Sequence, residues 1–165
     1  MHHFRRFAYY SLPLLLWMAV IFSLSTNSAS AAATNPVVNE ILRKLFPGVS
    51  AYLTEDQIRG IDFCIRKGAH VTEYTLLSLF AFRAFRAGRH EFYTFMAWGP
   101  VLFCILYAAS DEFHQSFYSQ RGAAVSDVFI DSYGVFLGAF IALWSMCLRL
   151  KHSCSKVTDL NHEVI

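Results

Sequence analysis

The stretch Val125–Leu148 reads VSDVFIDSYGVFLGAFIALWSMCL, and it shows what kind of fold to expect. It is apolar almost throughout and is long enough for a helix to cross a hydrocarbon core of ~30 Å. Two acids, Asp127 and Asp131, stand near its start. An ionised group inside a bilayer costs about 2.5–3.5 kcal/mol on insertion scales, so each acid needs a partner or a function. The stretch therefore predicts a membrane-spanning helix that carries part of a polar site.

The composition extends this prediction to the whole chain. Of its 165 residues, 55% are apolar and only 16% are charged, against about 45–50% and about 25% in soluble proteins. A domain of this size cannot bury such an excess, so its surface must be apolar as well. The basic residues cluster at the ends of the apolar runs, which predicts no nucleic-acid partner. The four cysteines form no CxxC pair and are interpreted as packing residues.

Three further apolar runs complete the predicted fold, an all-α integral membrane bundle of about four transmembrane helices in a single domain, 1–165. We expect the spans at 7–24, 69–85, 92–109 and 125–148. Gly99-Pro100 is expected to kink the third span. The first span also has the three parts of a cleavable signal peptide, although its length favours an uncleaved anchor.

Between the first two spans, residues 35–67 are mixed in character and are expected to form an outer segment. Apolar residues recur at helical spacing from Val37 to Phe46, which predicts a short amphipathic helix on the membrane surface. Thr54 followed by Gln57 forms a capping-box pattern, so another helix should begin there. The basic residues beside the opposite ends of the spans predict a multi-pass protein of the cytoplasmic membrane with both termini in the cytoplasm.

Polar side chains gather at the outer ends of the last three predicted spans. On the second span, Lys67, His70 and Glu73 lie along one helical face. A second group follows the third span, and a third group begins the fourth. The members of this polar cluster are Lys67, His70, Glu73, Asp111, Glu112, His114, Gln115, Arg121, Asp127 and Asp131.

The polar stripe of the fourth span continues into two glycines. Asp127 and Asp131 are followed at helical spacing by Gly134 and Gly138, which form a GxxxG patch. Such a patch lets another helix approach closely. That helix could belong to this chain or to a second copy, so an oligomer is one of the two expectations.

Two interpretations of the polar cluster stay open. The bases could simply neutralise the acids in a structural network between helices. However, the cluster holds two histidines, five carboxylates and two cations on one water-facing rim. That is more than such a network needs, and clusters of this kind are typical of functional sites. We therefore treat the cluster as a candidate site, catalytic or binding.

Three motifs of the chain, taken in order, resemble those of the VanZ-like family. They are KGAHVTEY at 67–74, DEFHQ at 111–115, and DVFIDSYGVFLG at 127–138, which follows Arg121. They look like the family patterns KxxHxxEY, DExxQ and DxxxNxxGxxxG, with Asp131 where the family usually has Asn. The resemblance covers about residues 66–140. It implies a bacterial multi-span membrane protein whose founding member confers low-level resistance to the glycopeptide teicoplanin, and it implies no mechanism.

Two functions are expected for such a protein, and whether it is an enzyme stays open. The first is an enzyme acting on a lipid or lipid-linked envelope substrate at the outer leaflet. Lys67 and Arg121 would hold a phosphate. His114 or His70 would be nucleophile or general acid/base beside a carboxylate. In one variant a divalent cation lies between the carboxylates and histidines. The second is a non-catalytic protein that binds or transports a lipid, a cell-wall precursor or the glycopeptide.

Overall fold

The structure is a computed structural model that describes residues 2–26, 40–41, 43–45, 47–50, 52–86, 98–117 and 125–163. Its helices are α1 (His2–Thr26), α3 (Pro47–Ser50), α4 (Glu55–Phe85), α5 (Trp98–Gln115) and α6 (Val125–Glu163). Residues 40–41 and 43–45, inside the predicted amphipathic helix, are helical too. No strand occurs in the described residues, which confirms the all-α prediction.

Helix α4 begins at the predicted capping box. The Thr54 amide donates to Gln57 Oε1 at 2.9 Å, and the Gln57 amide donates back to Thr54 Oγ1 at 3.4 Å. No residue then stops the helix before Phe85, because glycines such as Gly60 and Gly68 each cost a helix only about 1 kcal/mol. Residues 55–67 were expected in an outer segment, but they form the first part of the same helix as 69–85.

The described part of helix α5 runs from Trp98 to Gln115, so Gly99 and Pro100 are among its first described residues. The expected kink at Gly99-Pro100 falls where the described residues of α5 begin, and it stays a prediction. Residues 92–97 of the predicted third span lie outside the described residues. The DEFHQ motif forms the last turn of α5.

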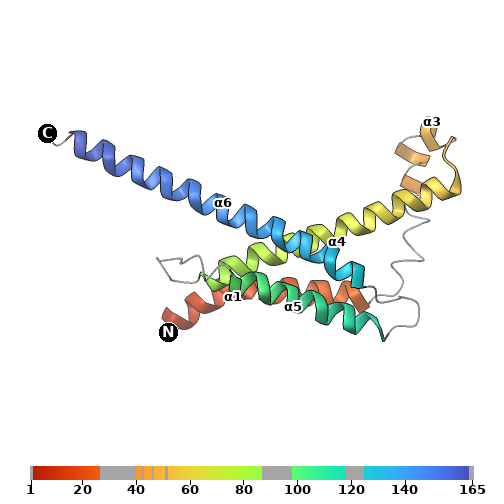
Figure 1. The fold of residues 1–165 in the computed structure, drawn as a ribbon, viewed down its shortest axis with the longest axis horizontal. Coiled ribbons are helices and arrows are strands. Elements are labelled where there is room, and N and C mark those ends of the chain that lie inside the picture. Colours follow the sequence, from red (N-terminus) through yellow and green to blue (C-terminus); the bar gives the residue numbers. More distant parts are fainter. Residues whose placement is uncertain are drawn as a thin grey trace.

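Helix α4 lies at the centre of the bundle and contacts α1, α5 and α6 (Figure 1). The Arg83 guanidinium, near the end of α4, lies 4.6 Å from the ring centroid of Tyr9, near the start of α1. The rings of Phe85 and Phe103 are 5.9 Å apart. The C-terminal end of α4 therefore meets the N-terminal ends of α1 and α5. The first turns of α4 and the last turns of α6 project from opposite ends of the bundle (Figure 1).

The GxxxG patch of α6 packs against α4 of the same chain. A Cβ added at Gly134 would lie 2.5 Å from the Val71 carbonyl oxygen, and one added at Gly138 would lie 2.5 Å from that of Thr75. The Thr75 hydroxyl donates to the Gly134 carbonyl at 3.1 Å. Two helix backbones can come this close only where one of them lacks side chains. The glycines are thus covered within the monomer.

The outer surface of the bundle is apolar. Large apolar side chains are exposed on every long helix, for example Leu16, Phe63, Leu102 and Phe140. Two segments, Phe7–Ser25 in α1 and Ser126–Ser153 in α6, are long and apolar enough to cross a membrane by length and composition. Exposed apolar area of this extent is unusual for a protein in water and indicates a membrane protein.

Candidate functional site

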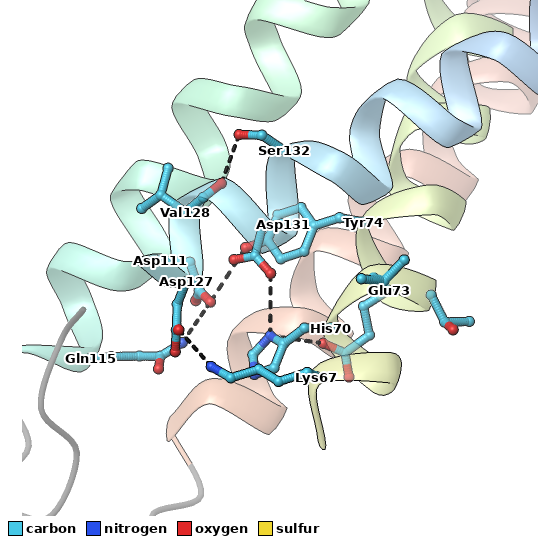
Figure 2. A network of polar contacts seen from close by, with 12 residues as sticks. Lys67, His70, Glu73, Tyr74, Asp111, Gln115, Asp127, Val128, Asp131 and Ser132 are labelled. Carbon is cyan, nitrogen blue, oxygen red and sulfur yellow. Dashed lines mark hydrogen bonds and ion pairs between the residues drawn. The ribbon is translucent and has the colours of Figure 1, made fainter. Parts of the chain in front are cut away.

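The polar stripes of α4 and α6 meet in register near one end of the bundle (Figure 2). Lys67 Nζ lies 2.5 Å from Asp127 Oδ1, and both side chains are nearly four-fifths buried. One turn further along both helices, His70 Nδ1 lies 3.5 Å from Asp131 Oδ1. The Asp131 side chain is only 1% exposed. These two contacts, together with the glycine packing, hold α4 against α6.

His70 also faces a carboxylate of its own helix. Its Nδ1 lies 3.9 Å from Glu73 Oε2, so the imidazole sits between Glu73 and Asp131 (Figure 2). The backbone carbonyl of Glu73 accepts a hydrogen bond from Trp17 Nε1 at 2.9 Å, which ties α1 to α4 at this level. A histidine between two carboxylates is oriented for proton transfer or for holding a charged ligand.

Helix α5 contributes Asp111, whose two oxygens differ in their surroundings. Oδ2 accepts hydrogen bonds from Gln115 Nε2 at 2.9 Å and from the Tyr74 hydroxyl at 3.4 Å. The residue is only 4% exposed, and Oδ1 has no hydrogen-bond partner among the described residues. A buried acceptor that is left unpaired costs free energy, so such an atom indicates a place for a donor from outside the protein.

A cavity of about 150 Å³ lies between the C-terminal parts of α1 and α5 and the middle of α4, where these groups lie. It is several times larger than the ~10–15 Å³ that one water molecule needs. Its lining residues are Ile21, Leu24, Ser25, Arg66, Ala69, His70, Glu73, Asp111 and Gln115. Four members of the predicted polar cluster therefore share one cavity, which could admit a small polar group.

Two polar lining residues, Arg66 and Ser25, were missing from the predicted cluster. Arg66 Nε lies 3.2 Å from Asp62 Oδ2, and the Asp62 side chain is 2% exposed. The spacing of four residues between this acid and this base is the signal that could have revealed the pair. Ser25 directly follows the first predicted span, 7–24, and no local pattern marked it as a site residue. Its hydroxyl is buried and, within the described part of the chain, unpaired.

Of the predicted site residues that the structure describes, the others do not line the cavity. Lys67 and Asp127 pair with each other beside it. The His114 ring lies 4.6 Å from the ring of Phe22 on α1, and Glu112 is buried on α5. Arg121 lies outside the described residues. That Lys67 and Arg121 hold a phosphate therefore stays a prediction.

The chemistry available in the cavity is that of proton and charge recognition. The carboxylates of Glu73 and Asp111 accept hydrogen bonds, Arg66 donates them, and His70 can do either. No three His, Cys, Asp or Glu side chains in the described ranges are grouped so that they could hold a metal ion.

Comparisons with known proteins complete this description. No curated protein and no solved structure matches the chain. The family model described as VanZ/LLP1 matches residues 10–148. This range includes the cavity and both pairs of contacts between α4 and α6. It also covers most of the chain, and the chain therefore belongs to the VanZ/LLP1 family.

Proposed function

We propose that this protein is a four-span membrane protein of the bacterial cell envelope that binds the polar headgroup of a lipid or lipid-linked precursor in the outer leaflet. The observation that carries the proposal is the unpaired, buried Asp111 oxygen beside a cavity of about 150 Å³. A buried carboxylate oxygen persists in this state where a ligand supplies the missing donor.

The proposal needs α4 and α5 to cross the membrane together with α1 and α6. On α5 the large apolar side chains of Trp98, Leu102 and Leu106 are more than half exposed and recur every four residues. Asp111 and Glu112, which lower the hydropathy of α5, are turned inward and are at most 5% exposed. A helix with this distribution suits a bundle whose outer face is lipid and whose inner face is polar.

The basic residues support an outer-leaflet position for the cavity. Arg83 and Arg86 end α4, and Arg149 and Lys151 lie in the last part of α6, all away from the cavity. Basic residues beside spans mark the cytoplasmic side. The cavity then faces outward, and both termini lie in the cytoplasm.

The rim of the cavity suits a lipid in particular. Leu24 lines the cavity and is 49% exposed, and Phe22 beside it on α1 is equally exposed. An acyl chain lying against this apolar surface would place its headgroup next to Ser25 and Asp111. In this way the membrane itself delivers the ligand.

A catalytic role is the second candidate, and His70 is the observation that favours it. Its imidazole lies between Asp131 and Glu73 and borders the cavity. A base oriented by a carboxylate within reach of a ligand is the arrangement of general acid–base catalysis. His114, packed against Phe22, is the weaker candidate for this role.

The proposal is tested by producing the chain in a teicoplanin-susceptible bacterium and measuring both teicoplanin susceptibility and membrane lipid composition. We expect the wild type to lower susceptibility and Asp111→Asn to abolish the effect at equal membrane levels. Asp56→Asn is the matched control, since its side chain is 93% exposed. Asp111→Asn with full activity would refute the cavity as the site.

The catalytic candidate is tested in the same cells. If His70→Gln stops a change in lipid turnover that the wild type causes, the protein is an enzyme. If lipid turnover is the same with and without the wild-type chain, binding alone explains the phenotype.

A further inference from the structure

The charged side chains around the cavity do not neutralise one another completely, because one carboxylate remains after the ion pairs are counted. Lys67 is paired with Asp127, and the Arg66 guanidinium is held by Asp62. Asp111 makes no ion pair with a basic side chain among the described residues. The cavity therefore has a carboxylate in excess, and its electrostatic potential favours a cation over an anion.

Two buried oxygen atoms beside the cavity, Asp111 Oδ1 and Ser25 Oγ, also lack a hydrogen-bond donor among the described residues. Asp111 Oδ1 can only accept, and the Ser25 hydroxyl, buried on the facing helix α1, can accept as well. A primary ammonium group has a positive charge, three N–H donors and no acceptor. A phosphate has the opposite properties and would be repelled by Asp111 and Glu73. The chemistry of the inner cavity thus matches an ammonium group.

Arg66 provides the complementary group at the rim. It precedes Glu73 by two turns of α4, so it lies about 10 Å nearer to the helix start. Its side chain is 36% exposed, and Asp62 orients it. A guanidinium whose side chain is partly exposed is well suited to bind a phosphate. The structure therefore offers an anion site at the rim and a cation site below it.

We infer that the cavity selects a zwitterionic aminophospholipid headgroup, with its primary ammonium at Asp111 and Ser25 and its phosphate at Arg66. The inference rests on the proposed headgroup binding and adds the class of ligand. The half-exposed Leu24 at the rim gives the acyl chains an apolar surface, which favours a lipid over a soluble amine.

The test uses the full chain purified in detergent and titrated with three short-chain probes, dihexanoyl phosphatidylethanolamine, phosphatidylcholine and phosphatidylglycerol. Affinity is read from the ligand-dependent rise in melting temperature and from native mass spectrometry. Phosphatidylcholine keeps the charge but has no N–H donor, and phosphatidylglycerol lacks the cation. We expect phosphatidylethanolamine to bind about ten-fold more tightly than either, the effect of one charge-assisted hydrogen bond.

Variants of the cavity residues show which side chains cause the preference for phosphatidylethanolamine. Asp111→Asn should bring the three probes to equal affinity, whereas Asp56→Asn should leave the preference unchanged. Arg66→Gln should weaken all three probes, because each has a phosphate. If Asp111→Asn does not fold, Ser25→Ala replaces it and should reduce the preference for phosphatidylethanolamine.

The outcomes separate this inference from the proposed function. Equal binding of the three probes to the wild type would overturn the ammonium site and leave headgroup binding in place. If none of the probes binds saturably, the proposed function fails as well. If Mg²⁺ or Na⁺ raises the melting temperature and displaces phosphatidylethanolamine, the site binds an inorganic cation and the inference is overturned. If ethanolamine phosphate binds as tightly as phosphatidylethanolamine, the ligand is a soluble headgroup compound and the assignment to a lipid is overturned.

Discussion

The close contact of α6 with α4 predicts that Gly138→Ala destabilises the protein. The added Cβ would lie 2.5 Å from the Thr75 carbonyl oxygen and 2.7 Å from the Ser78 Cβ. Ordinary contacts of this kind begin at about 3.4 Å, so the helices must separate by almost 1 Å. Since the obstacle is largely backbone, no side chain can simply rotate away.

The size of the effect follows from two opposing terms. Overpacking of a tight interface costs about 1–3 kcal/mol. Alanine is a better helix former than glycine by up to about 1 kcal/mol, which offsets part of that cost. Because the obstacle at 2.5 Å is a backbone carbonyl oxygen, the overpacking cost lies in the upper part of its range, at about 2–3 kcal/mol. The net destabilisation for Gly138→Ala is then about 1–2 kcal/mol. Separation of the helices should also lengthen the contact of 3.5 Å between His70 and Asp131, so ligand binding should weaken with stability.

The assay is thermal unfolding of the purified protein in detergent, followed by circular dichroism. For a chain of this size, 1 kcal/mol corresponds to about 2–4 °C in melting temperature, so we expect a fall of roughly 2–8 °C. Gly68→Ala is the matched control, because nothing lies within 4 Å of its added Cβ. That variant should melt at or slightly above the wild type. A Gly138→Ala protein as stable as the control would show that α4 and α6 are not in backbone contact.

Three further predictions concern other parts of the bundle. A double-mutant cycle of Lys67→Met and Asp127→Leu should give a coupling energy of about 1–3 kcal/mol by thermal unfolding, because both groups are largely buried; additive effects would mean that the pair does not form. Trp17→Phe should cost about 1 kcal/mol through loss of the hydrogen bond to an α4 carbonyl, and unchanged stability would contradict that bond. In variants with one cysteine each, a membrane-impermeant maleimide should label the exposed Cys64 in intact cells but a cysteine at Lys151 only after permeabilisation; the reverse pattern would invert the proposed topology.

The sequence by itself determined the helical class of this protein and the polar faces of its helices, although it did not show that residues 55–67 continue into the second predicted span. Side-chain spacing along one helix is a local property, and it placed Lys67, His70 and Glu73 together. The capping box at Thr54 was likewise readable, because caps act over a few residues. The ordered motifs also led to the family.

Only the tertiary structure decided which groups meet across helices. Spacing along α4 cannot tell whether Lys67 neutralises an acid of α5 or Asp127 of α6, since that depends on how the helices rotate and approach. Backbone contact at Gly138 sets that approach for α6 and thereby brings His70 to Asp131. The cavity depends on the same packing. It combines Asp111 with Ser25, which directly follows the first predicted span and which no local pattern marks.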